Sequence, residues 1–304
     1  MADGRTIVSI KRPLASVAGL LLLSVLAACS DGGLATGSLS LAVTDAPVDR
    51  ASAVVVQFTG VEIKPTEGEA LDFTFAEPRA IDLLALSGTD SDALLENVEV
   101  PAGRYNWVRL KVNAAEDGVA DSYIDLTDGS RHELEVPSGA ETGLKLVSGF
   151  NVPAGGAAGF TIDFDLRSSV HEPMDAADSY KLRPALRIVD NTQVGAIAGT
   201  VAAALVPDGC APAVYVFAGG GVTPDDVDGM APEPVTSARV ELDVASGQYG
   251  YRAGFLAAGA YTVAFTCDAD ADDPATDDAL AFAGTQAATV IAGQTTAVSF
   301  AAPP

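Results

Sequence analysis

The sequence has little positive charge. Its 17 lysines and arginines stand against 41 aspartates and glutamates, which gives a formal net charge of −24 at pH 7. Nucleic-acid binding requires a basic footprint, and docking of a folded body on anionic lipid requires clusters of basic residues. The composition therefore argues against both kinds of partner for the folded body, and it favours an acidic surface that resists aggregation.

Histidines are also scarce, and hydrolase motifs are missing. The chain has 2 histidines, His132 and His171, and contains neither a Gly-x-Ser-x-Gly nor a His-Glu-x-x-His motif. Those motifs place a serine nucleophile or a zinc ion in many hydrolases. A catalytic triad would need one of the two histidines beside a nucleophile and a carboxylate. We therefore expect a protein that is not an enzyme, and an unrecognised hydrolase built on His132 or His171 is the least favoured alternative.

Long apolar runs are confined to the start of the chain. Residues 14–25 are apolar and follow Lys11 and Arg12. This run is shorter than the about 20 residues that a membrane-spanning helix needs. A basic start, a short apolar core and small residues after it are typical of a secretory signal peptide.

The residues after this core resemble a bacterial lipobox. They are Leu26-Ala27-Ala28-Cys29, followed by Ser30. The resemblance implies cleavage before Cys29, a diacylglycerol thioether on its sulfur and acylation of the new N-terminus. Several acyl chains anchor a protein stably where one chain is marginal. By similarity to Gram-negative sorting, the absence of Asp at position 30 favours the outer membrane. The alternative is that Cys29 is the last residue of an ordinary signal core.

Cysteine is rare as well. With Cys29 assigned to lipid, 2 of the 3 cysteines remain, Cys210 and Cys267. An even remainder in an exported chain indicates one disulfide, which would stabilise its domain by about 4 kcal/mol on the chain-entropy model. A metal pair is the rival interpretation, and no histidine lies near either cysteine in the sequence.

Alternating polar and apolar residues are abundant in the rest of the chain. They indicate half-buried strands, for example at residues 38–43, 105–112, 160–167 and 180–188. Asp128-Gly129 between two such runs is a hairpin signal, and residues 91–97 favour a short helix with Leu94 and Leu95 facing inward. We therefore predict an all-β protein with two β-sandwich domains after a lipoprotein signal peptide. The predicted boundaries are residues 1–28 for the signal, 29–37 for the lipidated Cys and spacer, 38–191 for the first domain and 195–304 for the second.

Three stretches of the first domain resemble the bacterial family called domain of unknown function 4382. They are residues 39–47, which include Thr-Asp-Ala-Pro, residues 100–105, which include Pro-Ala-Gly-Arg-Tyr, and residues 180–187. The resemblance covers residues 37–191. It implies a module of lipoproteins or surface proteins and no assigned activity.

The second domain resembles the carboxypeptidase-regulatory-like, transthyretin-like sandwiches. The resemblance lies in Gly247-Gln248-Tyr249 and in residues 255–263, which end in Tyr-Thr-Val. Related folds include carbohydrate-binding modules, so a glycan ligand enters as an analogy.

Tyr105, Trp107 and Arg109 are predicted to share one face of a strand. Aromatic rings beside cations can stack on sugars or hold a partner peptide. They also cover sheet faces routinely, with the Arg and Lys stems lying on the rings. We favour the covering role, and a ligand face remains the alternative.

An acidic stretch is a weak candidate for a calcium site. Asp268, Asp270, Asp272 and Asp273 offer oxygen ligands at alternating places. However, the glycine that turns an EF-hand loop is missing, and Ala279 stands where that loop has Glu. We favour a solvated loop over a metal site, and Asp277 and Asp278 could complete an irregular one. No other cofactor is expected.

Taken together, these features predict a lipid-anchored protein of the cell envelope that faces away from the cytoplasm. The leading hypothesis is a non-enzymatic binding or adhesion module for a protein or glycan ligand. The alternative is a structural spacer or assembly subunit of the envelope without a ligand.

Overall fold

The computed structural model of this 304-residue chain describes residues 35–46, 51–137, 143–173, 179–183 and 185–302. The described residues belong to one compact unit that spans residues 34–304. The predicted signal peptide and Cys29 lie outside the described residues. In the described part of the chain, no helix has both the length and the apolar character to cross a bilayer.

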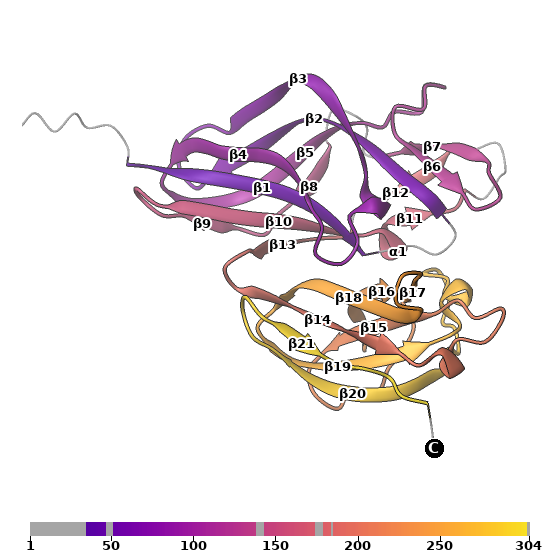
Figure 1. The fold of residues 1–304 in the computed structure, drawn as a ribbon. Coiled ribbons are helices and arrows are strands. Elements are labelled where there is room, and N and C mark those ends of the chain that lie inside the picture. Colours follow the sequence, from indigo (N-terminus) through magenta and orange to yellow (C-terminus); the bar gives the residue numbers. More distant parts are fainter. Residues whose placement is uncertain (1–34, 47–50, 138–142, 174–178, 184, 303–304) are drawn as a thin grey trace, which may run out of the picture. The chain divides into compact units, whose positions relative to one another are not determined.

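Within this unit we call the described residues up to 190 the first domain and those from 194 the second domain, following the predicted boundaries. The first domain begins with a four-stranded sheet in the order β13-β10-β1-β4 (Figure 1). Strand β1 is parallel to β10 and antiparallel to β4, and β10 is antiparallel to β13. The bounds of these strands are β1 Thr36–Ala46, β4 Asp92–Pro101, β10 Ala157–Asp165 and β13 Leu186–Asp190.

A second, nine-stranded sheet has the order β11-β12-β7-β6-β2-β5-β8, with β3 also paired to β2 and β9 to β5. A 3-10 turn, η1 (Leu83–Ala85), follows β3, and a single helical turn, α1 (Leu166–Ser169), follows β10. The strands of this sheet are β2 Ala51–Pro65, β3 Leu71–Asp82, β5 Gly103–Asn113, β6 Tyr123–Leu126, β7 Arg131–Glu135, β8 Leu144–Leu146, β9 Phe150–Val152, β11 Val170–His171 and β12 Tyr180–Leu182.

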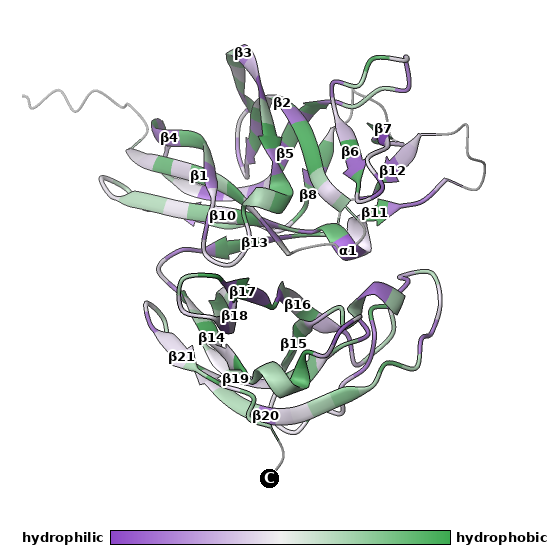
Figure 2. Cartoon of the chain, turned by 45° about the vertical axis from the view of Figure 1, so that its right-hand side comes forward, coloured by the Kyte–Doolittle hydropathy of each residue, from purple (hydrophilic) through white to green (hydrophobic). Residues whose placement is uncertain are grey.

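The two sheets enclose one hydrophobic core. Along β1, for example, Leu39, Leu41 and Val43 are buried while the residues between them are half-buried. Figure 2 shows this alternation of hydrophobic and hydrophilic residues along the strands. Phe58 of β2 meets Phe164 of β10 edge to face at 6.3 Å between ring centroids, so side chains of both sheets interlock as in a sandwich.

The second domain consists of two four-stranded sheets, β17-β18-β14-β21 and β16-β15-β19-β20. Val214 and Val216 of one sheet and Ile197 and Ala253 of the other lie in the same buried cluster. The elements are β14 Val194–Val201, η2 Ala203–Leu205, β15 Ala213–Ala218, β16 Pro234–Arg239, β17 Glu241–Asp243, β18 Gln248–Ala257, β19 Gly259–Thr266, η3 Ala269–Ala271, β20 Phe282–Val290 and β21 Thr295–Ala297. The prediction of an all-β sandwich fold is therefore confirmed, while the exact domain boundaries stay predictions.

Each domain has a buried tyrosine near the start of a core strand whose hydroxyl bonds to the backbone four residues earlier. The Tyr105 hydroxyl donates a hydrogen bond of 2.7 Å to the Pro101 carbonyl, and the Tyr261 hydroxyl donates one of 2.8 Å to the Ala257 carbonyl. In both places a tight turn with Gly precedes the tyrosine, at Gly103 and Gly259. Each ring thereby packs on the core while its hydroxyl has a hydrogen-bond partner, as in the tyrosine corners of other sandwiches.

Two sequence-based expectations about local structure are wrong. Residues 91–97 are not helical, because they enter strand β4. Leu94 and Leu95 are both buried although they are neighbours, since pairing with β1 shifts register on either side of Leu41. Such bulges let successive side chains face the same side. Residues 180–188 are not one strand either, because β12 pairs with β7 of one sheet and β13 with β10 of the other.

The hairpin predicted at Asp128-Gly129 is confirmed by the antiparallel pairing of β6 and β7. Gly129 has a φ of 88°, a conformation that glycine adopts without strain.

Candidate functional site

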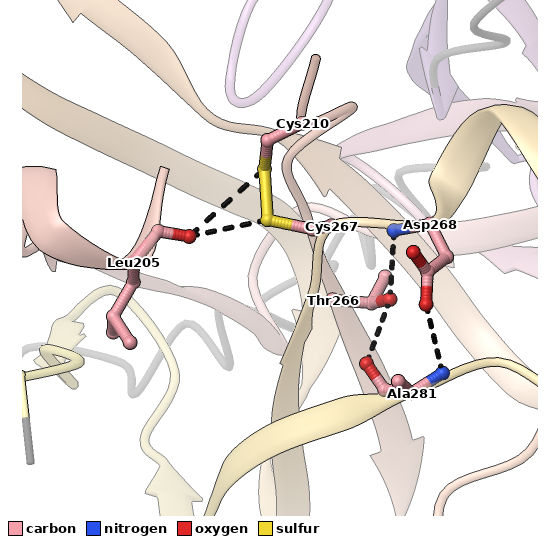
Figure 3. The surroundings of a disulfide bond; sticks show 6 residues. All are labelled: Leu205, Cys210, Thr266, Cys267, Asp268 and Ala281. Atoms are coloured by element: carbon pink, nitrogen blue, oxygen red, sulfur yellow. Dashed lines mark hydrogen bonds between the residues drawn. A yellow bond between two sulfur atoms is a disulfide. The ribbon is translucent and has the colours of Figure 1, made fainter. Parts of the chain in front are cut away.

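The predicted disulfide between Cys210 and Cys267 is confirmed, with 4.7 Å between the Cα atoms (Figure 3). The Cys267 Sγ atom lies 3.1 Å from the Leu205 carbonyl oxygen. Because a disulfide sulfur carries no proton, we interpret this as a sulfur–oxygen contact without a hydrogen bond. The bond joins the segment before β15 to the residue after β19, at the base of the second domain's acidic loop.

Asp268 closes that loop and does not face a metal position. Its Oδ2 atom accepts a hydrogen bond of 3.0 Å from the Ala281 amide, and its own amide donates to Thr266 Oγ1 at 3.0 Å. Figure 3 shows these bonds holding the two ends of the loop together. Asp268 thus has a structural role next to the disulfide.

Trp107 lies half-buried on the outer side of β5, between two cations. The guanidinium carbon of Arg109 is 5.1 Å from the Trp107 ring centroid, and Lys145 Nζ is 4.4 Å from it. Arg109 also donates a hydrogen bond of 2.8 Å to Glu62 Oε2 on β2. We call Trp107, Arg109 and Lys145 the Trp107 face.

Tyr105 does not belong to this face, although simple alternation placed it there. It is fully buried and stacks on Phe150 with 5.0 Å between ring centroids. The pairing of β5 with β2 slips between Trp107 and Tyr105, and this bulge turns Tyr105 to the core. The sequence gives no direct sign of such a bulge.

The two histidines are not arranged for catalysis in a triad. His132 Nε2 lies 3.1 Å from Ser130 Oγ, but that hydroxyl is closer to Asp128 Oδ1, at 2.6 Å. The serine proton therefore goes to the carboxylate, and the ring nitrogen does not serve as the base that activates it. Asp128 and Ser130 lie in the β6–β7 turn, and His132 lies in β7.

His171 lines a cavity of about 280 Å³ with Tyr180 and Asp270 among its walls. Burial lowers the pKa of His171, and the positive charge of Arg183 lowers it further, while Asp273 opposes the shift. Among the described residues that line this cavity there is no serine, threonine or cysteine.

A buried ion pair lies in the wall of the same cavity. Arg167 of α1 has its Nη1 atom 3.3 Å from Asp272 Oδ2, and the two side chains are 4% and 0% exposed. Arg167 also donates a hydrogen bond of 2.8 Å to the Ala269 carbonyl. Asp272 accepts further hydrogen bonds from the Tyr215 hydroxyl and, at 3.1 Å, from the Val227 amide. Burial raises the pKa of Asp272, and the Tyr215 hydrogen bond and the Arg167 charge oppose that rise.

The four aspartates predicted as calcium ligands are not brought together. Asp268 and Asp272 are engaged as described above, and Asp273 Oδ1 accepts a hydrogen bond of 3.1 Å from the Ala275 amide. Residues 269–271 form the 3-10 turn η3. Side chains at alternating positions of such a turn point in different directions, so the spacing that resembles a calcium loop does not produce one.

Instead, acidic residues of two different loops converge. Residues 219–233 join β15 to β16, and residues 267–281 join β19 to β20. The two loops cover Tyr215 and Phe217, whose rings face away from the main core of the second domain. The Asp278 amide donates a hydrogen bond to Asp226 Oδ2, which ties one loop to the other.

At this junction, single carboxylate oxygens of Asp226, Asp228 and Asp277 lie within 4.8 Å of one another. We call these three residues the Asp226 cluster. Asp226 is fully buried, Asp228 is half-buried and Asp277 is exposed. Oxygens of Asp226, Asp272 and Asp278 form a second group with the same spacing.

Sequence reasoning missed Asp226 and Arg167, the buried charged residues at the centre of these arrangements. The only available signal was the acidic character of residues 225–228, which reads as a solvated loop. Pairing between residues that lie 52 positions apart, such as Asp226 and Asp278, is set by the arrangement of the strands and not by a local motif.

Residues 36–184 match the family model described as domain of unknown function (DUF4382). The match covers almost all of the first domain, so the resemblance inferred from residues 39–47, 100–105 and 180–187 is confirmed for residues 36–184. No curated protein matches the chain. The transthyretin-like resemblance of the second domain stays a prediction.

Several solved structures match at low identity. The TIE protein of Bacillus anthracis is 11% identical, with a TM-score of 0.20, and the match covers 87% of this chain and 33% of the TIE chain. A leucine-rich repeat protein of Bacteroides thetaiotaomicron is 13% identical, with a TM-score of 0.21, and the match covers 88% of this chain and 27% of that protein. The minor pilin of Streptococcus agalactiae is 11% identical, with a TM-score of 0.20, and the match covers 86% of this chain and 94% of the pilin.

This chain therefore spans about a third or less of the first two proteins. Further matches carry the names of adhesins, major pilins and a fimbrial protein. At these TM-scores the matches carry no argument about function, and the description of the fold rests on the strands themselves.

Proposed function

We propose that this protein is a lipid-anchored module of the bacterial cell envelope that binds a glycan or a protein and does not act by catalysis. The observation that carries the proposal is the Trp107 face. A half-exposed indole ring stands between Arg109 and Lys145 in a chain whose net charge is −24. Positive charge is scarce in this protein, yet two cations lie against its only tryptophan.

The chemistry of this face suits a ligand that combines a flat apolar surface with negative charge. An indole ring stacks on sugar rings and on apolar side chains, and a guanidinium group pairs with carboxylates. Lys145 is exposed, while Arg109 is held in place by Glu62. An acidic glycan or an acidic protein segment fits this combination best.

The first test is binding of the purified chain to a glycan array that includes acidic polysaccharides. We expect Trp107→Ala to weaken binding at least about tenfold. Stacking of a nucleic-acid base on an aromatic ring contributes on the order of 1–3 kcal/mol, and we expect a similar contribution from a stacked sugar ring. Phe75→Ala is the matched control, since Phe75 is another half-buried ring beside an arginine, with the Arg79 guanidinium 5.8 Å from its centroid. Equal loss in both variants would argue against the Trp107 face, and a wild type that binds no glycan or envelope protein would favour a structural spacer.

The second test concerns the anchor. We expect a fatty-acid probe to label the wild type in bacteria and to leave Cys29→Ala unlabelled, because Cys29 follows the lipobox residues Leu26 to Ala28. A variant without Cys210 and Cys267 is the control, and it should be labelled like the wild type. Equal labelling of the wild type and Cys29→Ala would refute lipid anchoring. Fractionation of the labelled protein then tests the proposed outer-membrane location.

A further inference from the structure

We propose that the Asp226 cluster, formed by Asp226, Asp228 and Asp277, binds a calcium ion. The site lies in the second domain, on different strands and loops from the Trp107 face. It therefore does not depend on the proposed glycan or protein ligand, and either proposal can fail without the other.

The first argument is the state of Asp226. Its side chain is fully buried, and its Oδ1 atom makes no hydrogen bond. The other oxygen, Oδ2, accepts the hydrogen bond from the Asp278 amide. A buried carboxylate oxygen without a partner is costly, and buried charges in proteins are normally paired or coordinate a metal. Asp226 is also the buried member of the group whose carboxylate oxygens converge with those of Asp228 and Asp277.

The second argument is the local charge. Carboxylate oxygens of Asp226, Asp228 and Asp277 lie within 4.8 Å of one another, and Asp225 adds a fourth carboxylate next to Asp226 in the chain. Like charges at such short distances repel one another unless a cation lies between them. The group of Asp226, Asp272 and Asp278 is a poorer candidate, because Arg167 already pairs with Asp272.

The ligand chemistry selects calcium. All three ligands are carboxylate oxygens, which suit hard cations, and neither histidine nor cysteine takes part. Calcium accepts several protein oxygens in a flexible arrangement, whereas magnesium keeps several waters and usually takes only one or two carboxylates. Three carboxylate oxygens within 4.8 Å of one another therefore fit calcium better.

A bound ion would also fasten two loops to each other. Asp226 and Asp228 belong to the loop between β15 and β16, and Asp277 belongs to the loop between β19 and β20. Calcium should therefore raise the thermal stability of the second domain as well as bind to it.

The test is isothermal titration of the purified full-length chain with calcium chloride after treatment with a chelator. We expect one site with a dissociation constant on the order of 10⁻⁴–10⁻³ M, as in other extracellular calcium modules. Asp277→Asn should weaken binding at least about tenfold, and because Asp277 is exposed, the fold should be kept. The matched control is Asp270→Asn, which removes the same charge from an exposed position of the same loop outside the cluster. It should bind calcium within about twofold of the wild type.

Circular dichroism supplies the second measurement. Calcium at ten times its dissociation constant should raise the melting temperature of the wild type and of Asp270→Asn, and should raise that of Asp277→Asn by less than half as much. Absence of binding heat in the wild type at 10 mM calcium, roughly ten times the weakest expected dissociation constant, would overturn the proposal. An equal loss of calcium affinity in Asp277→Asn and Asp270→Asn would also overturn it, because this result would indicate diffuse attraction to an acidic surface. Magnesium binding as tight as calcium binding would overturn it as well.

Discussion

Replacing both Cys210 and Cys267 with alanine should lower the free energy of unfolding of the second domain by about 4 kcal/mol. The disulfide closes a loop of 57 residues, and a cross-link of that length removes conformational entropy from the unfolded chain by about this amount. The folded state should change little, because the Ala211 amide still donates its hydrogen bond of 2.8 Å to the Cys267 carbonyl. Since a domain is stable by only about 5–15 kcal/mol, the effect is large.

Unfolding in guanidinium chloride of the full-length chain measures this effect. Trp107 is the only tryptophan, and it lies in the first domain, so tryptophan fluorescence reports that domain while circular dichroism reports both. We expect the double variant to shift the dichroism transition more than the fluorescence transition. A reducing agent should bring the wild type to the stability of the variant and leave the variant unchanged. An unchanged midpoint in the variant would contradict the prediction.

Arg167→Met should lower the free energy of unfolding by about 3–5 kcal/mol at pH 7. The substitution removes the cation that faces Asp272 and leaves a fully buried carboxylate without its charge partner, which is the costly way to break a buried ion pair. Arg79→Met is the control, because Arg79 pairs with Asp92 at a site where both side chains are about 40% exposed, and such pairs contribute about 1 kcal/mol or less. A loss in Arg167→Met no larger than that in Arg79→Met would show that the buried pair is not a stabilising contact.

The loss in Arg167→Met should also depend on pH. Burial already raises the pKa of Asp272 above its usual value, and removal of Arg167 raises it further. A carboxyl group whose pKa is raised by folding destabilises the folded state above the unfolded pKa of about 3.9, and the penalty grows until the pH passes the folded pKa. The variant should therefore be closest to the wild type near pH 4 and furthest from it at neutral pH, as followed by denaturant unfolding at both values.

Local patterns in the sequence were sufficient for much of the fold. Alternation of polar and apolar residues indicated strands such as β1, β5 and β10, because one face of each strand packs on a core. Asp128-Gly129 indicated the β6–β7 turn, since glycine can adopt the positive φ that this turn uses. The number of cysteines indicated the disulfide. Each of these signals depends on neighbours in the chain or on simple counting.

The errors arose where pairing between strands changed the direction of side chains. Alternation places Tyr105 on the outer face with Trp107, but the bulge in the β2–β5 ladder turns it to the core. Leu94 and Leu95 suggested a helix, but the bulges between β1 and β4 bury both of them in a strand. A bulge depends on the partner strand, so the alternation of one strand does not reveal it.

By itself, the sequence determined the all-β class, the pairing of Cys210 with Cys267 and the resemblance of residues 37–191 to a family without assigned activity, because these depend on residue type and local order. Only the tertiary structure decided which charged residues meet. Arg167 and Asp272 are 105 positions apart (272 − 167) and Asp226 and Asp278 are 52 apart, yet strand topology brings each pair into contact. The two candidate sites differ for the same reason. Two of the three residues of the Trp107 face, Trp107 and Arg109, lie in one strand, β5, whereas the Asp226 cluster forms only because two loops fold over the same sheet.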